Sequence, residues 1–163
     1  MIRILMVCLG NICRSPMAEF IFRDMANQRA AAESFYVASA GTSSEELGNP
    51  VYPPAKRKLY SLGIDCSGKR ARTMRREDYR EFDLLLGMEQ RHLNQMRRIC
   101  GGDPEGKIHL LLEHSPHPRD IDDPWYTDDF DTACRDIQEG CGQWLNLLLA
   151  EKAGRPERKE GRL

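Results

Sequence analysis

The fold of this chain is constrained most by short apolar runs that alternate with segments whose apolar residues recur at helical spacing. Four such runs occur, at residues 2–8, 35–38, 82–88 and 108–112. Nearly continuous apolar runs of this length are typical of strands that are covered on both faces, as strands of parallel sheets are. Because these predicted strands alternate with predicted helices, the pattern indicates an α/β fold with an open parallel sheet.

Two segments have the clearest helical spacing. After Pro16, apolar residues recur at helical steps and predict one apolar face, made of Met17, Phe20, Ile21 and Met25. A second helix is predicted from Phe130 to about Glu151, with its apolar residues three or four positions apart: Phe130, Cys134, Ile137, Cys141, Leu145 and Leu148. This spacing assigns both cysteines of that helix to the core.

Weaker signals complete the outline. Residues 78–80 and 89–98 are expected to be parts of further helices, with Glu89 on a solvated helix surface. Residues 48–54 are rich in Pro and Gly and predict a turn-rich connection. The 163 residues suit one domain. We expect a single domain over residues 1–152 and a flexible tail over residues 153–163, which lack apolar content.

Composition narrows the class of protein. Hydrophobic residues make up 40% and charged residues 30%, with a net charge of −1, which is typical of a globular chain that binds neither nucleic acid nor membrane. The apolar N-terminus is interrupted by Asn11 and Arg14 before it reaches the length of a secretory signal. We therefore expect a cytoplasmic protein whose six cysteines are free thiols. We also expect a monomer, although no sequence feature specifies the oligomeric state.

The segment Cys8-Leu-Gly-Asn-Ile-Cys-Arg14-Ser-Pro16 leaves a predicted strand and enters a predicted helix. Backbone N–H groups of such a loop converge on one point, and the helix N-terminus adds a partial positive charge, so the loop can bind phosphate. Gly10 and Asn11 are residue types that tolerate a positive φ angle. The planar guanidinium of Arg14 can bind two phosphoryl oxygens.

A thiol in these surroundings is expected to ionise, and the thiolate is the nucleophilic form, so Cys8 is the predicted nucleophile. Ser15 is placed to donate a hydrogen bond to its sulfur. A lone cysteine after a strand is more often a packing residue, but the neighbouring residue types favour chemistry here. A phenoxide leaving group also needs an acid. Asp120, Asp122 and Asp123 are the candidates, and Asp123 precedes Pro124, which favours an extended loop position.

Together, the segment Val7–Glu19 and the motif Asp-Asp-Pro-Trp-Tyr at 122–126 closely resemble the low-molecular-weight protein-tyrosine phosphatases, over about residues 2–150. The resemblance implies an open four-stranded parallel sheet with helices on both faces, of the flavodoxin-like or phosphotyrosine phosphatase I-like type. It implies hydrolysis of phosphotyrosine in proteins without a metal or other cofactor. It also implies that Cys8 attacks phosphorus, that Arg14 binds the phosphoryl group and that Asp123 protonates the leaving oxygen. Phosphate or another oxyanion binds the loop residues, which are Leu9, Gly10, Asn11, Ile12, Cys13 and Ser15.

Three positions extend this comparison. The family's usual histidine beside the loop aligns with Lys69, which can donate hydrogen bonds but accepts none. An aromatic residue found at the pocket rim of some members aligns with about Glu45, which leaves Trp125 and Tyr126 as expected pocket walls. Cys13 matches a position that can trap the oxidised nucleophile as a reversible disulfide.

Three alternatives stay open. An arsenate reductase of the same fold uses a similar loop but needs a distal cysteine pair, and residues 86–93 contain no cysteine. A protein-arginine phosphatase has threonine at the position of Ile12. A phosphopeptide-binding module would capture phosphate without cleaving it, but would need neither Cys8 nor Asp123.

Overall fold

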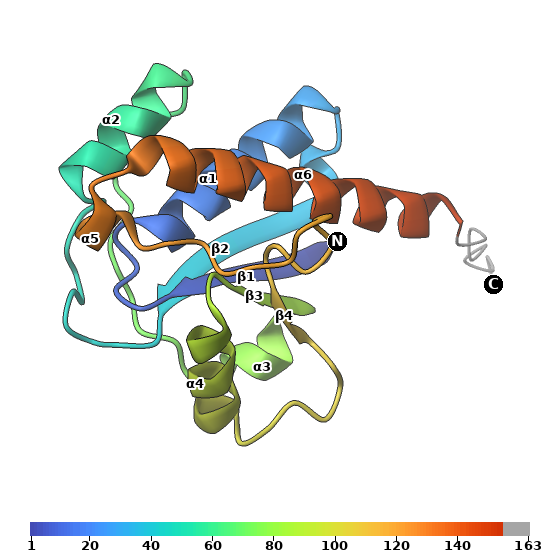
Figure 1. Ribbon diagram of the computed structural model, residues 1–163. Coiled ribbons are helices and arrows are strands. Elements are labelled where there is room, and N and C mark those ends of the chain that lie inside the picture. The colour runs from blue at the N-terminus through green and yellow to red at the C-terminus, as the bar shows by residue number, and fades with distance from the viewer. Residues whose placement is uncertain (155–163) are drawn as a thin grey trace.

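The four apolar runs form one parallel sheet in the computed structural model, which describes residues 1–154 (Figure 1). The strands are β1 (Ile2–Cys8), β2 (Phe35–Gly41), β3 (Leu84–Gly87) and β4 (Ile108–Leu110). Their order in the sheet is β2-β1-β3-β4, and every neighbouring pair is parallel. The predicted fold class is confirmed.

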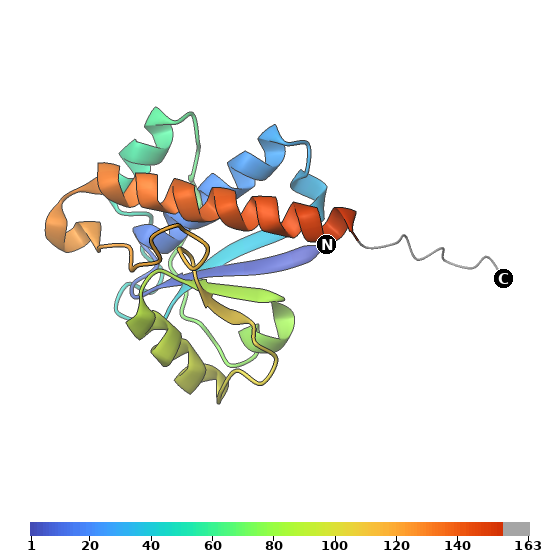
Figure 2. The same ribbon diagram turned by 45° about the vertical axis from the view of Figure 1, so that its right-hand side comes forward.

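Side chains of β1 alternate between two cores because successive residues of a strand point to opposite faces. Ile4 and Met6 pack with residues of α1 (Arg14–Gln28), α2 (Pro53–Ser61) and α6 (Phe130–Ala153). Leu5 and Val7 pack with residues of α4 (Gln90–Cys100) on the other face, where α3 (Asp78–Glu81) also lies. Figures 1 and 2 show these two helix layers on either side of the sheet.

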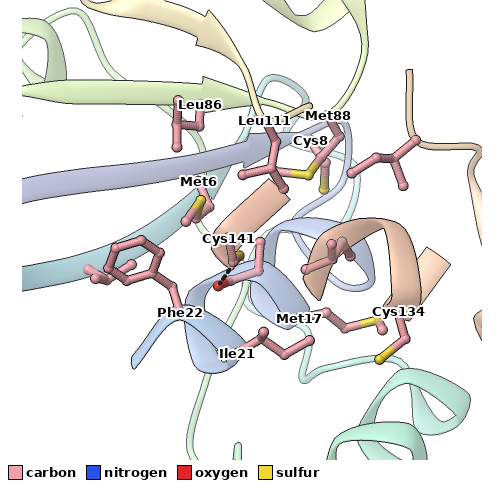
Figure 3. Close-up of a cluster of buried hydrophobic side chains, with 14 of the residues drawn as sticks. Met6, Cys8, Met17, Ile21, Phe22, Leu86, Met88, Leu111, Cys134 and Cys141 are labelled. Carbon is pink, nitrogen blue, oxygen red and sulfur yellow. Dashed lines mark hydrogen bonds between the residues drawn. The ribbon is translucent and has the colours of Figure 1, made fainter. Parts of the chain in front are cut away.

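The apolar face predicted for α6 is confirmed, since all six of its predicted residues are buried. The thiol of Cys141 lies 3.7 Å from the carbonyl oxygen of Ala18 on α1, and both cysteines of α6 face the core (Figure 3). The face predicted for α1 is only half right. Met17 and Ile21 are buried, whereas Phe20 and Met25 are partly buried.

Phe22, which lies outside the predicted face, is buried in the core, whereas Phe20 and Met25 lie at its edge. It is fully buried, and its ring meets that of Phe35 edge to face at 5.2 Å between centroids. Helix α1 packs against both the sheet and α6, so its buried surface is wider than the single stripe that the spacing predicts.

Strand β2 continues to Gly41, beyond the predicted end at Ala38. Its last residues are small, so they lack the apolar signal of a strand. A Cβ atom on Gly41 would lie 2.6 Å from the carbonyl oxygen of Leu9, so this glycine lets the loop after β1 approach β2 closely. Strands β3 and β4 are shorter than the apolar runs that contain them.

Helix α2 was not predicted, because its first residues, Pro53 and Pro54, belong to the segment expected to be a turn. Prolines suit the first turn of a helix, where an N–H has no intrahelical partner. The short elements α5 (Pro124–Thr127) and the 3-10 turn Ala32–Ser34 were also not predicted.

The last helix extends to Ala153, which is followed by Gly154 as its C-cap. The remainder of the predicted tail, residues 155–163, lies outside the described residues. Over residues 1–154, no helix is both long enough and apolar enough to cross a membrane. The carboxyl ends of β1, β2 and β3 meet at one edge of the sheet, since Cys8 pairs with Gly41, and Val7 pairs with Gly87.

Candidate active site

The loop between β1 and α1 turns its carbonyl oxygens away from its own centre. Those of Cys8, Leu9 and Ile12 accept hydrogen bonds from backbone N–H groups of Thr42, Ser43 and Tyr52. Within residues 1–154, no backbone N–H of residues 9–13 donates to another protein group. The loop therefore presents unpaired donors at the N-terminus of α1, which is the arrangement that binds anions.

Asn11 has a φ angle of 59°, so the predicted left-handed conformation is confirmed there. The same expectation for Gly10 is wrong, because its φ angle is not positive. Glycine suits position 10 for a different reason: a Cβ atom there would lie 3.3 Å from Cγ of Glu46. Space beside Glu46, rather than backbone strain, limits the side chain at this position.

Cys8 is the last residue of β1 and is almost fully buried. Its sulfur lies 3.0 Å from Oγ of Ser15, the contact expected from the sequence. The side-chain amide of Asn11 donates to the same Ser15 oxygen at 2.7 Å. Because that bond uses an acceptor site of Ser15, the hydroxyl hydrogen has two acceptors within reach, the sulfur at 3.0 Å and the carbonyl oxygen of Ala40 at 3.5 Å.

The second hydrogen of the Asn11 amide leads to a buried polar chain. It donates to Oγ of Ser39 at 3.0 Å, and the Ser39 hydroxyl donates to Oε1 of Glu19 at 2.7 Å. Lys69 joins this chain at its far end. Its ammonium donates to the carbonyl oxygen of Ser39 at 3.0 Å and lies 3.6 Å from Oε1 of Glu19.

These contacts explain how Lys69 can occupy the position of the family's usual histidine, although lysine donates hydrogen bonds and accepts none. It does not have to accept a hydrogen bond here, since both of its partners, a carbonyl oxygen and a carboxylate, are acceptors. Burial lowers the pKa of Lys69 below its ordinary value, and the carboxylate of Glu19 opposes that shift. The amide of Asn11 keeps its orientation because its oxygen accepts from the backbone N–H of Arg72 at 3.1 Å.

Arg14, the first residue of α1, is buried and held by three groups. Its Nη1 donates to Oε2 of Glu89 at 2.7 Å and to the carbonyl oxygen of Ile121 at 2.7 Å. Its Nη2 lies 3.3 Å from Oδ2 of Asp123. These contacts fix the guanidinium plane beside the loop.

Glu89 was wrongly predicted to lie on a solvated helix surface. It precedes α4 as its N-cap, and its side chain is 17% exposed. Burial disfavours its ionised form, but the hydrogen bonds from Arg14 and Arg91 outweigh burial and hold the pKa of Glu89 below its usual range. The carboxylate is therefore a permanent anion behind Arg14 at neutral pH.

Of the three candidate acids, Asp123 alone lines the pocket. It is the extended N-cap of α5, as Pro124 predicts, and its Oδ1 accepts from the backbone N–H of Trp125 at 3.0 Å. Asp120 instead accepts from the backbone N–H of Gln90 at 2.8 Å, and Asp122 is exposed.

The pocket above the loop is lined by most of the predicted site residues and by Glu46, which was not predicted. Its lining residues are Cys8, Leu9, Gly10, Ile12, Cys13, Arg14, Glu45, Glu46, Asp123, Trp125 and Tyr126. The predicted loop residues Asn11 and Ser15 are not among its lining; they lie behind it, in the hydrogen-bond chain. The Trp125 ring is half exposed and packs 4.7 Å from the ring of Tyr52. Burial, followed by the charge of Cys8, raises the pKa of the Cys13 thiol to about 12.

These groups can act on a tetrahedral oxyanion. Unpaired amides and a buried guanidinium neutralise such a ligand, a sulfur lies at the base of the same loop, and a carboxylate lies beside the guanidinium. Over residues 1–154, no group of three His, Cys, Asp or Glu side chains is placed to hold a metal ion.

Comparisons with known proteins agree with this geometry. A sequence model of the family described as low molecular weight phosphotyrosine protein phosphatase matches residues 3–154. The low molecular weight protein-tyrosine-phosphatase YfkJ of Bacillus subtilis is 36% identical over 154 residues, covering 93% of this chain and 99% of that protein. Its crystal structure superposes with a TM-score of 0.88, covering 93% of this chain and 97% of the other.

Two further relatives extend the comparison. The human low molecular weight phosphotyrosine protein phosphatase is 37% identical over 147 residues, covering 87% of this chain and 92% of the human protein. The tyrosine phosphatase Wzb from Escherichia coli K30, solved in complex with sulphate, superposes with a TM-score of 0.78 at 29% identity, covering 90% of this chain and 97% of the other.

Proposed function

The chain belongs to the low-molecular-weight protein-tyrosine phosphatase family, a family of hydrolases, and we propose that Cys8, Arg14 and Asp123 perform its reaction. The observation that carries these roles is the loop itself: unpaired backbone N–H groups surround a position bordered by the Cys8 sulfur and the Arg14 guanidinium. A phosphoryl group bound there has the nucleophile below it and the acid Asp123 beside it. The sulphate bound by the related Wzb supports an oxyanion ligand.

The reaction has two steps. In the first, the thiolate of Cys8 attacks phosphorus, the bond from phosphorus to the tyrosine oxygen breaks, and Asp123 transfers its proton to that oxygen. In the second, the Asp123 carboxylate takes a proton from water as the water attacks the phosphocysteine. Phosphate leaves and the thiolate is restored. Arg14 and the loop amides stabilise the charge on the transferred oxygens in both steps.

Ser15 assists the sulfur in both steps. Its hydroxyl hydrogen can bond the thiolate, because Asn11 donates to its oxygen and the other acceptor, the carbonyl oxygen of Ala40, is farther away at 3.5 Å. A donor on the sulfur stabilises the resting anion and, in the second step, the leaving thiolate. The buried chain through Ser39 to Glu19 and Lys69 keeps Asn11 in the orientation that this bond requires.

The substrate class follows from the pocket. Trp125 and Tyr126 border the opening as walls for the ring of a phosphotyrosine side chain in a protein, and Glu45 takes the place of a third aromatic wall. The enzyme works as a monomer whose catalytic domain spans residues 1–152. A cytoplasmic location suits it, because a reducing compartment keeps Cys8 reduced and therefore able to act as a nucleophile. Cys13 protects the oxidised nucleophile by forming a disulfide with it.

Hydrolysis of p-nitrophenyl phosphate in the presence of a chelator tests this proposal. The wild type is expected to turn over and to be inhibited by vanadate, and Cys8→Ser is expected to be inactive with an unchanged melting temperature. Cys100→Ser, a change at a partly exposed cysteine on α4, is the matched control and should stay active. Turnover by Cys8→Ser would remove the proposed nucleophile. Phosphotyrosine, phosphoserine and phosphoarginine peptides compared in one assay separate the alternative substrate classes.

A further inference from the structure

His92 on α4 is fully buried, and the proposed reaction gives it no role. Its Nδ1 accepts a hydrogen bond from the backbone N–H of Glu89 at 3.1 Å. A ring nitrogen that accepts carries no proton, so in the neutral ring the proton is on Nε2. Within residues 1–154, this Nε2 is buried and has no hydrogen-bond partner. Buried donors without a partner are rare in folded proteins and call for an explanation.

The unpaired Nε2 of His92 lies beside the carboxylate that holds Arg14. Its Nε2 lies 3.4 Å from Oε2 of Glu89. The same oxygen accepts from Nη1 of Arg14 at 2.7 Å and from Nη2 of Arg91 at 3.0 Å. His92 therefore approaches this oxygen from the buried side, while the side chain of Arg91 is half exposed.

The position of His92 is fixed by close packing. A Cβ atom on Gly87, the last residue of β3, would lie 2.6 Å from Leu93 and 3.4 Å from Cβ of His92. The absence of a side chain at Gly87 lets the first turn of α4 lie against the strand. The imidazole thus has little freedom to move relative to the sheet that carries the catalytic loop.

The Glu89 side chain accepts a hydrogen bond from the backbone N–H of His92, in the capping box at the start of α4, and two cations draw its carboxylate in opposite directions. Arg14 draws its carboxylate inward, and Arg91 with the surrounding water draws it outward. When a phosphoryl group takes part of the charge of the guanidinium, the inward attraction weakens. The buried Nε2–H of His92, which lies 3.4 Å from Oε2, can then form a hydrogen bond with the carboxylate and keep it in place. Burial, with the charge of Arg14 as a second cause, lowers the pKa of His92 to about 3, so the ring stays neutral and does not compete with Arg14 for the charge of Glu89.

We infer that His92 is a positioning residue for the phosphate-binding arginine: its Nε2–H restrains the Glu89 carboxylate, which in turn orients the guanidinium of Arg14. This inference rests on the role proposed for Arg14. It does not make His92 a catalytic residue, because His92 lies behind Glu89 and does not line the pocket. Its effect is expected in oxyanion binding.

Two substitutions separate this role from a purely structural one. In His92→Asn, the side-chain oxygen can replace Nδ1 as acceptor for the Glu89 N–H, but the donor at Nε2 is lost. In His92→Gln, the side-chain amide can replace Nε2 as donor, but the acceptor near the backbone is lost. We expect His92→Asn to keep its melting temperature and to bind vanadate about tenfold more weakly, with a similar loss in kcat/KM, the size typical of one buried hydrogen bond to a charged group.

For His92→Gln we expect vanadate affinity within about twofold of the wild type, with a lower melting temperature. Arg91→Gln, which removes the exposed partner of the same oxygen, is the control and should change vanadate affinity little. Wild-type affinity in His92→Asn overturns the inference. If His92→Asn does not fold, His92→Gln decides: retained affinity supports the inference, and a tenfold loss overturns it.

A double-mutant cycle tests whether His92 acts through Glu89. In a Glu89→Gln background, His92→Asn should cause no further loss of vanadate affinity, whereas additive losses would contradict the inference. Vanadate binding is measured by calorimetry, which does not depend on turnover. A wild type that binds no vanadate would sink the proposed function itself, while a wild type that binds it and a His92→Asn variant that binds it equally well would sink only this inference.

Discussion

Nη2 of Arg14 lies 3.3 Å from Oδ2 of Asp123, although one residue begins the first helix and the other precedes the last two. The proposed phosphate-binding cation and the proposed acid are therefore direct neighbours before any substrate arrives. A leaving oxygen attached to a phosphoryl group on Arg14 would lie within reach of the Asp123 carboxyl group. This proximity supports the role proposed for Asp123, and the exposed neighbour Asp122 has no such contact with Arg14.

Asp123→Ala should slow hydrolysis of aryl phosphates that have poor leaving groups by about 100-fold, because general acid catalysis contributes at least this much to such reactions. Activated esters, whose leaving groups need no proton, should be affected much less. Steady-state rates over a series of substituted phenyl phosphates measure the difference. Asp122→Ala is the control and should follow the wild type over the whole series. Equal losses for good and poor leaving groups in Asp123→Ala would contradict the assignment.

Arg14→Lys should lose roughly 100-fold or more in kcat/KM although the charge is retained. An ammonium cannot make two parallel bonds to a phosphoryl group while also bonding Glu89 and the carbonyl oxygen of Ile121. Vanadate affinity should fall with kcat/KM, since both depend on the same planar contact. Activity within a few-fold of the wild type would show that charge alone suffices at this position.

Much of the fold could be predicted because its signals are local. The alternation of apolar runs with helical spacing specified the sheet, and the loop residues from Cys8 to Ser15 could be recognised from their types and order. Phe22 was missed because a single helical stripe does not describe a helix that packs on two sides. The end of β2 was missed because Gly41 is required by the close approach of the loop after β1, and a contact of this kind produces no apolar pattern in the sequence.

The contact of Arg14 with Glu89 could not be predicted for a related reason. Glu89 and His92 stand in a polar stretch that reads as a solvated helix, and only the neighbouring positions of β1 and β3 in the sheet bring them beside the catalytic loop. The replacement of histidine by Lys69 could be noticed in the sequence, but its consequence depends on Glu19, whose burial no local pattern indicates. Contacts between distant charged residues are thus the part of this site that requires the structure.

Lys69→Met should destabilise the protein by about 2 kcal/mol, as measured by urea denaturation, because it leaves the buried Glu19 with fewer compensating charges. The loss should stay below that of a fully orphaned charge, since Arg23 still pairs with Glu19 at 2.8 Å. Lys58→Met removes a pair with the exposed Asp131 and should cost less than about 1 kcal/mol. Equal effects of the two substitutions would show that the pair at Lys69 contributes no more than a surface contact.

Cys13→Ser should make inactivation by hydrogen peroxide harder to reverse. Peroxide converts the Cys8 thiolate to a sulfenic acid, and the thiol of Cys13 can condense with it to form a disulfide and water. Because the pKa of Cys13 is raised to about 12, it stays a thiol at neutral pH and does not compete with Cys8 for peroxide. After peroxide treatment, dithiothreitol should restore the wild type and the control Cys66→Ser, but restore Cys13→Ser only in part. Full recovery of Cys13→Ser would argue against the disulfide.

Acidification should destabilise the wild type through His92 between pH 6.5 and about 4.5. The folded-state pKa of His92 is lowered to about 3 by burial, from an ordinary value of 6.5, so below pH 6.5 the unfolded chain binds a proton that the folded protein does not. Stability is complete above pH 6.5 and falls by at most about 1.4 kcal/mol per pH unit as the pH drops toward the folded-state pKa. The lowered pKa of Glu89 also makes the protein less stable on acidification, but only below its ordinary value of 4.5. Between pH 6.5 and about 4.5 the effect of His92 is therefore measured without that of Glu89. The free energy of unfolding is measured at several pH values from 7 to about 4.5. It should decline more steeply with falling pH for the wild type than for His92→Asn. Parallel curves would show that the imidazole is not buried in its neutral form.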